Sequence, residues 1–248
     1  MGNESVVRLL LARGAQVNSQ GGEYGNALQA ATDKGNEAVV RLLLERGAEV
    51  NAQGGFYGNA LQAAACNGNE SVVKILLERG AEVNARGGRY ENALEAAADR
   101  GSESVAQLLL EGGAEVNAQG GGKGNALQAA ALKGNSIGVQ RLLERGAEVN
   151  AQGGYYGNAL QAAALHGSRS VVKLLLEHGA EVNAQGGCCG NALQAAVSAL
   201  SRSESVVRLL LEHGADVNAQ GGLDGNALQA ARRKENDSVV QLLLKYGA

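Results

Sequence analysis

Apolar residues recur along the chain in two alternating blocks, each with the spacing of a helix. In one unit, the apolar residues of the stretch NESVVKILLER fall three and four apart, which predicts an amphipathic helix over residues 69–79. The block before it, NALQAAACN at residues 59–67, predicts a shorter, alanine-rich first helix. Gly68 separates the two blocks, and Gly80 provides the left-handed residue that ends the second helix. The unit therefore reads as helix, glycine turn, helix.

The start of each first helix carries its own capping signal. Asn59 can accept a hydrogen bond from a free amide of the first turn, and Gln62, three residues later, can reach back to the amide of Asn59. The same pairing occurs in the other units, as Asn26 with Gln29, Asn92 with Glu95, Asn125 with Gln128, Asn158 with Gln161, Asn191 with Gln194 and Asn226 with Gln229. We therefore predict a variant capping box in all seven units.

These blocks form an internal repeat. The Asn of NAL recurs at a spacing of 33 five times and then once at 35, and a block like VVRLLLERGAEVNAQGG follows each occurrence and also opens the chain. Residues 1–248 thus read as a single array, with a leading half repeat over 1–18 and then about seven repeats of 33 residues. Neither helix can bury its apolar stripe alone, so neighbouring units must supply the core of a one-dimensional stack.

Between the second helix of one unit and the first helix of the next lies the stretch AEVNAQGG. Its alternating Val and Asn and its paired glycines predict an extended segment that ends in a tight hairpin projecting from the stack. We call the two residues that follow the paired glycines the tip. The predicted fold class is an all-α repeat solenoid with projecting β-hairpin loops.

A 33-residue period with a turn and two helices per unit resembles the ankyrin repeat. The ending RGAEVNAQ at residues 46–53 looks like that family's passage from the second helix into the next hairpin, although NALQ stands where the family has TPLH. Units of the form GGxYGNALQAA are similar to ankyrin arrays of fungal NOD-like receptors. The resemblance implies protein binding through the hairpin tips and the first-helix face of the stack.

Composition narrows the range of functions. The formal charge of −3 leaves no basic excess for nucleic acid, and no apolar run is long enough to cross a bilayer. Met1 is followed by a charged, helix-like stretch rather than a secretory leader, and three cysteines, two of them adjacent, do not make a disulfide framework. We therefore expect no nucleic-acid partner, no membrane partner and a cytoplasmic (intracellular) location.

Two kinds of position vary between units and are candidates for binding a protein partner. One kind is the tip, where six of the seven aromatic residues lie and where the first residue differs in every unit. The other is the end of the first helix. The candidate residues are Glu23, Tyr24, Phe56, Tyr57, Arg89, Tyr90, Lys123, Tyr155, Tyr156, Leu223 and Asp224 at the tips, and Asp33, Asp99, Leu132, Leu165 and Arg233 at the helix ends.

Aromatic side chains are common anchors of protein interfaces. The competing interpretation is that the tyrosine repeated at the second tip position only packs one hairpin on the next. For Phe56, Tyr155, Arg89 and Leu223 at the first position, the alternative is neutral drift on a tolerant surface.

The sequence contains no pattern that predicts a catalytic or metal site. His166, His178 and His213 lack convergent partners, and the paired glycines precede hairpins rather than the strand-to-helix turn of a phosphate-binding loop. Cys188 and Cys189 could bind a soft metal or form a strained disulfide, but no further Cys or His completes a site, which favours free thiols. We predict no catalytic residues, no metal and no cofactor.

Two units depart from the pattern. Gly138 stands where the others have Val, and Arg141 where they have Leu or Ile, which predicts a weak second helix. The unit that begins at Asn191 has two extra residues near 198–203 and lacks the glycine between its helices, so we expect its loop to protrude. Both ends lack a polar capping repeat, which indicates a fragment and weak end-to-end self-stacking.

The sequence thus favours a non-catalytic protein-binding module that acts as the sensor array of a larger signalling receptor. Two alternatives remain open. One is a structural spacer or scaffold without a specific ligand, and the other is an accessory region of an enzyme whose catalytic domain lies outside this chain.

Overall fold

The computed structural model describes residues 4–199 and 204–248, and divides the chain into two compact units, 1–118 and 119–248. The first unit contains α1 (Glu4–Ala12), α2 (Ala27–Asp33), α3 (Glu37–Glu45), α4 (Ala60–Cys66), α5 (Glu70–Glu78), α6 (Ala93–Arg100) and α7 (Glu103–Glu111). The second contains α8 (Ala126–Leu132), α9 (Ser136–Glu144), α10 (Ala159–His166), α11 (Arg169–Glu177), α12 (Ala192–Ser198), α13 (Glu204–Glu212), α14 (Ala227–Arg233) and α15 (Asp237–Lys245). The described residues form no β-strand longer than an isolated bridge.

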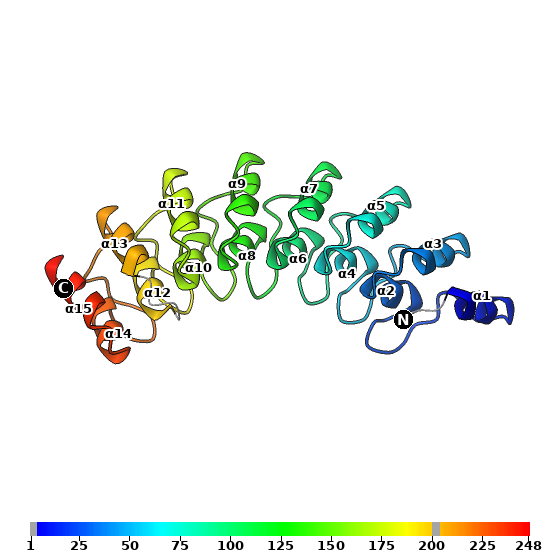
Figure 1. The fold of residues 1–248 in the computed structure, drawn as a ribbon, viewed down its shortest axis with the longest axis horizontal. Coiled ribbons are helices and arrows are strands. Elements are labelled where there is room, and N and C mark those ends of the chain that lie inside the picture. The colour runs from blue at the N-terminus through cyan, green and yellow to red at the C-terminus, as the bar shows by residue number, and fades with distance from the viewer. Residues whose placement is uncertain (1–3, 200–203) are drawn as a thin grey trace. The chain divides into compact units, whose positions relative to one another are not determined.

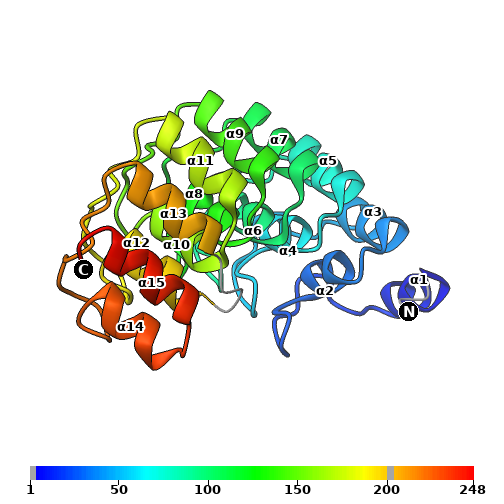
Figure 2. The same cartoon turned by 60° about the vertical axis from the view of Figure 1, so that its left-hand side comes forward.

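Within each unit the helices form two layers. In the first unit the alanine-rich first helices α2, α4 and α6 contact one another in order, and the second helices α3, α5 and α7 form a parallel row beside them (Figure 1). The second unit repeats this arrangement with α8, α10, α12 and α14 in one layer and α9, α11, α13 and α15 in the other (Figure 2). The predicted all-helical repeat fold is confirmed.

The core follows the predicted stripes. In α5, Val72, Val73, Ile75 and Leu76 are buried, and α4, which packs against it, is buried along its whole length. The alanines of the first helices let neighbouring repeats approach closely, which is why aromatic side chains are not needed in the core. Only α1 buries none of its residues, because the described chain contains no first helix beside it.

The capping signals are confirmed, but the reciprocal arm is not general. All seven cap asparagines accept a hydrogen bond from the amide three residues later. The return bond from the glutamine oxygen to the cap amide is present at Asn125 (2.7 Å) and Asn158 (3.0 Å). The corresponding oxygens of Gln29, Gln62 and Gln194 have no hydrogen-bond partner, so the full capping box predicted there is wrong.

The same glutamines have a second role, which is to join one repeat to the next. Gln62 Nε2 donates to the carbonyl oxygens of Ala85 (3.1 Å) and Glu91 (3.3 Å), at the start and end of the following loop. Equivalent bonds join Gln29, Gln128, Gln161 and Gln194 to the loops that follow them. Each of these buried amides therefore holds the next loop against its own helix.

The loops are only partly as predicted. The tips close as tight turns, for example through a 2.7 Å bond from Gly54 N to Gly58 O. Four of them form a single antiparallel bridge, at residues 54–58, 87–91, 153–157 and 186–190, in place of a paired hairpin. The preceding AEVNAQ stretch folds into a turn rather than an extended segment. There Asn51 accepts from the amide of Glu82 (2.9 Å) and donates to the carbonyl of Gly80 (3.0 Å), so it clamps the next repeat.

The paired glycines allow neighbouring loops to interlock. A Cβ atom on Gly55 would lie closer than 3.0 Å to the backbone of Tyr24, and one on Gly88 would meet the backbone of Tyr57 in the same way. Both glycines also have positive φ, of 64° and 66°. Their presence is therefore required by the loop of the preceding repeat as well as by their own turn.

The irregular helix α9 retains its helical form but buries fewer residues than α11, the next second helix of the same unit. Only Val139 and Leu142 are buried in α9, whereas α11 buries Val171, Val172 and Leu175. In the repeat that begins at Asn191, the loop predicted to protrude lies mainly at residues 200–203, outside the described residues. Its first helix ends at Ser198, and the next residue, Ala199, is buried.

We expect faster amide hydrogen exchange over residues 138–142 of α9 than over residues 171–175 of α11. The glycine at 138 removes apolar burial and costs about 1 kcal/mol of helix stability relative to alanine. Exchange read residue by residue by NMR or mass spectrometry would show the difference. Equal protection of the two helices would contradict it.

Candidate functional site

The first-position tip residues are joined from one repeat to the next by backbone hydrogen bonds. In the first unit, the amide of Phe56 donates to the carbonyl of Glu23 (2.9 Å), and the amide of Arg89 donates to the carbonyl of Phe56 (3.2 Å). In the second, the amide of Tyr155 donates to Gly122 (2.8 Å), and the amide of Cys188 donates to Tyr155 (3.0 Å). These bonds set the freely varying residues in a row, which we call the tip row of each unit.

Side chains of the tip rows are accessible. Phe56 is 42% exposed and Tyr155 63%, and Leu223, at the same repeat position, is 85% exposed. In the first unit the guanidinium of Arg89 lies 5.3 Å from the centre of the Phe56 ring, and Glu23 at the start of the row is exposed. Each unit thus presents at least one large apolar side chain to solvent, which is the feature that a partner could bury.

The repeated tyrosine at the second tip position behaves differently. Tyr90 is only 5% exposed, and its hydroxyl lies 3.7 Å from the sulfur of Cys66 in the preceding repeat. Tyr57 is half-buried and hydrogen-bonds Asp33, also in the preceding repeat. Burial, and then the neighbouring carboxylate of Asp33, raise the pKa of Tyr57 to about 12. These two tyrosines therefore join one repeat to the preceding one.

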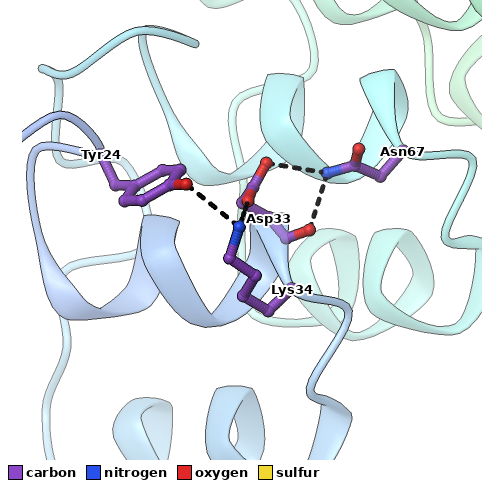
Figure 3. A network of polar contacts seen from close by, with 4 residues as sticks. All are labelled: Tyr24, Asp33, Lys34 and Asn67. Atoms are coloured by element: carbon purple, nitrogen blue, oxygen red, sulfur yellow. Dashed lines mark hydrogen bonds and ion pairs between the residues drawn. The ribbon is translucent and has the colours of Figure 1, made fainter. Parts of the chain in front are cut away.

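A polar network connects a tip with the ends of two first helices (Figure 3). Lys34 Nζ donates to the Tyr24 hydroxyl (3.0 Å) and lies 2.7 Å from Asp33 Oδ2, while Asn67 of the next repeat donates to the carbonyl and carboxylate of Asp33 (3.0 and 3.3 Å). Burial alone would raise the pKa of Asp33, but the hydrogen bonds from Lys34, Tyr57 and Asn67 outweigh it and hold this pKa below its ordinary value.

This network predicts a pH-dependent difference between the wild-type chain and Asp33→Asn. Because the pKa of Asp33 is lowered on folding, its carboxylate stabilises the fold above the ordinary carboxyl pKa, and this contribution is lost as the pH falls through the lowered value. We expect the wild type to be the more stable protein at neutral pH and the difference to shrink below about pH 4. Urea unfolding midpoints measured for both chains between neutral pH and about pH 3 test this, and a constant difference would refute it.

Other predicted helix-end residues take several different environments. Asp99 is 3% exposed, so it lies within the stack and cannot contact a partner in this arrangement. Leu132 and Leu165 are half-buried. Arg233 is largely exposed and pairs with Asp224 (2.7 Å) of its own tip. At the second tip position Lys123 and Tyr156 are half-buried, the latter with its ring 5.2 Å from that of Tyr155.

The structure thus groups the sequence-predicted residues into those that face solvent and those that hold repeats together. It also shows stacking contacts that the sequence analysis missed, among them Arg100, whose Nε donates to the carbonyl of Cys66 in the preceding repeat (3.1 Å). Within the described ranges, no three His, Cys, Asp or Glu side chains come together as metal ligands, and no helix is long and apolar enough to span a membrane.

Comparison with known proteins agrees with this geometry. The family model for ankyrin repeats (3 copies) matches residues 1–54, 49–120 and 94–186, and the single ankyrin repeat model matches residues 191–222. The chain belongs to the ankyrin repeat family. The crystal structure of the human ASB11 ankyrin repeat domain is similar to this chain, with a TM-score of 0.74 and 26% sequence identity, covering 90% of this chain and 98% of that one. No curated protein sequence matches the chain.

Ankyrin repeats are generally protein–protein interaction modules, and the fold is a non-catalytic scaffold. In this chain, the NALQ block and the Asn of the loop serve contacts between repeats. The tip rows are the part of the ankyrin array whose side chains vary from repeat to repeat.

Proposed function

We propose that this ankyrin array binds a protein partner through its tip rows, with Phe56 and Arg89 as the anchor in the first unit and Tyr155 and Leu223 in the second. The observation that carries the proposal is the contrast in exposure between the two residues of a tip, clearest at residues 56–57 and 89–90. Phe56 is exposed while the adjacent Tyr57 is half-buried, and Arg89 is exposed while the adjacent Tyr90 is buried. Contacts within the stack account for the tyrosines, but not for the exposed residues beside them.

Nothing in the stack requires a large apolar side chain at the first tip position, where other repeats carry Glu23 or Gly122. The backbone bonds of the tip row are made whatever the side chain, since both donor and acceptor belong to the main chain. A partner that covered Phe56 or Tyr155 would gain about 2 kcal/mol or more from each. The residues best placed to join them are Glu23, Tyr24, Lys123, Tyr156, Asp224 and Arg233.

The wider role that we propose is the sensor array of a larger signalling receptor in the cytoplasm, in line with the GGxYGNALQAA units and their similarity to the arrays of fungal NOD-like receptors. The spacer and the enzyme-accessory alternatives make different predictions. A spacer has no specific ligand, and an accessory region is encoded next to a catalytic domain. The full-length reading frame decides between receptor and enzyme.

The test of tip binding is the triple variant Phe56→Ala, Arg89→Ala, Tyr155→Ala. We expect its affinity for a partner isolated with the wild-type array to fall at least about 100-fold, from losses of about 1–2 kcal/mol at each site, with an unchanged melting temperature. A matched control replaces Arg41, Lys74 and Lys173 by Ala on the second helices, where each pairs only with a glutamate of its own helix. Equal affinity of both variants would reject the tip rows as the binding surface.

A further inference from the structure

The tip at residues 188–189 places two cysteines where two other tips, at 56–57 and 155–156, place aromatic pairs. Successive side chains of a strand point to opposite faces, but in these tight turns they converge. The rings of Phe56 and Tyr57 lie 5.0 Å apart, and those of Tyr155 and Tyr156 lie 5.2 Å apart. At Cys188 and Cys189 the same turn brings the two sulfur atoms to 3.4 Å. The convergence belongs to the loop and does not depend on the cysteines.

A small cavity lies beside the two thiols within the second unit. It has a volume of about 100 Å³ and is lined by both cysteines together with Gln194, Leu223, Asp224 and Arg233. This space exceeds the roughly 30 Å³ that one water occupies in the liquid. The Tyr155 hydroxyl, which hydrogen-bonds the Cys188 thiol, lies close by. A ligand of a few atoms therefore fits next to both sulfurs.

The separation of the sulfurs indicates the kind of atom that can bridge them. A bond from sulfur to a soft ion is about 2.3 Å long, so two such bonds span about 3.4 Å when they meet near 95°, about 3.8 Å at a tetrahedral angle and about 4.6 Å in a line. The observed 3.4 Å corresponds to the first case. Trivalent arsenic has this geometry, because it binds three ligands in a pyramid with angles near 95°.

The other ligands that two cysteines could take fit less well. A structural zinc ion needs four ligands, and in the described chain no three His, Cys, Asp or Glu side chains are grouped as metal ligands. Asp224, which lines the cavity, is paired with Arg233. A direct disulfide needs Cα atoms 4.4–6.8 Å apart, whereas adjacent residues joined by a trans peptide are about 3.8 Å apart. A bridging atom avoids that strain, since the sulfurs already stand at the required distance.

We propose that Cys188 and Cys189 form a dithiol site that binds trivalent arsenic. Arsenous acid, As(OH)₃, exchanges two hydroxyl groups for the two sulfurs, and each thiol proton leaves with a hydroxyl as water, so that the product is one S–As–S bridge with a remaining As–OH and two waters. Arsenic and sulfur keep their oxidation states. The remaining hydroxyl occupies the cavity that the two cysteines line with Gln194 and Arg233.

The protonation of Cys189 agrees with this exchange. Burial, and then the hydrogen bond with Cys188, raise the pKa of Cys189 to about 12, so this sulfur is a thiol at neutral pH. A thiol carries the proton that the departing hydroxyl needs. A protonated thiol is also a poorer nucleophile toward oxidants than a thiolate.

The experiment titrates arsenite into the full chain in a phosphine reductant, which offers no competing dithiol. We expect one arsenic per chain by intact-mass measurement, with Cys188 and Cys189 both protected from alkylation by iodoacetamide. Cys188→Ser and Cys189→Ser should each weaken arsenite binding about 10²–10⁴-fold, because the second bond is intramolecular in the wild type. Cys66→Ser, at the lone buried cysteine, should leave it unchanged.

Three results would overturn the proposal. The first is wild-type affinity in either tip variant, and the second is an arsenic adduct whose protected residue is Cys66. The third is loss of two hydrogens from the 188–189 peptide, which would mean that the pair closes as a disulfide instead. Protection of the wild-type thiols is measured without any substitution, so the test does not depend on the folding of the variants.

Discussion

Gly55→Ala is expected to lower the free energy of unfolding by about 2–5 kcal/mol. The new Cβ atom would lie closer than 3.0 Å to the backbone of Tyr24, which belongs to the neighbouring loop and cannot rotate away. Alanine at a positive φ costs about 1–2 kcal/mol, and forcing an extra carbon into a packed contact adds typically about 1–3 kcal/mol. Urea unfolding monitored by circular dichroism would give the value.

Gly47→Ala is the matched control for this prediction. Gly47 has a φ of 84°, also in the left-handed region, but a Cβ atom there would meet nothing within 4 Å. Its replacement should cost only the conformational term of about 1–2 kcal/mol. Equal losses in the two variants would show that the interlocked loops contribute nothing beyond the glycine conformation.

The second large effect is expected at a leucine of the sequence VVRLLL, which occurs in both α1 and α3. Leu43 in α3 is 2% exposed, so Leu43→Ala should cost about 2–5 kcal/mol through lost burial and the cavity left behind. Leu10 holds the same place in α1 but is 54% exposed, and Leu10→Ala should cost less than about 1 kcal/mol. Unfolding midpoints of the two variants provide the comparison.

The two variants test the effect of packing, because the hexapeptides are identical and only the helices that cover them differ. A loss at Leu10 as large as that at Leu43 would mean that a second copy of the chain covers α1 in solution. Sedimentation at the concentration of the unfolding experiment would then show an oligomer, as the proposed end-to-end stacking requires. A monomer with a small loss at Leu10 would exclude that stacking under these conditions.

The parts of the fold that sequence could predict are those decided within one repeat. The cap asparagines and Gly80 act on residues three or four positions away, so their spacing was enough to identify their roles. The apolar stripe of α5 is likewise local. These predictions are confirmed because helix geometry alone brings the interacting groups together.

Contacts between repeats were harder to predict. The position of Gln62 predicts a capping role, yet its side-chain amide donates hydrogen bonds to carbonyl oxygens 23 and 29 residues later. The sequence predicts an extended segment at Asn51, whereas its side chain hydrogen-bonds the turn of the next repeat. The signal in the sequence is that this Asn recurs before Ala-Gln in most repeats, although nothing in its own loop requires an asparagine there. Only the placement of the next repeat shows what it binds.

For the candidate site, variation between repeats identifies the variable positions, but not which of their side chains are exposed and which are buried. Tyr57 and Tyr90 are aromatic, like Phe56 and Tyr155. Within one repeat, no sequence pattern distinguishes a tyrosine that contacts the preceding repeat from one that faces solvent. The position of Asp99 varies between repeats as a surface position does, but Asp99 itself is buried. The repetition of tyrosine at one position, in contrast to the free variation beside it, was the useful guide.

The links between repeats also have a consequence for how such a gene can change. Each loop presents the same glycine surface and carbonyl groups to the preceding repeat. To the following repeat, the loop presents the same asparagine amide and the first helix presents the same glutamine amide. Duplication or deletion of one 33-residue block in the coding sequence therefore joins surfaces that already match. The number of tips can grow or shrink by recombination, while point substitution at the first tip position alters what each one recognises.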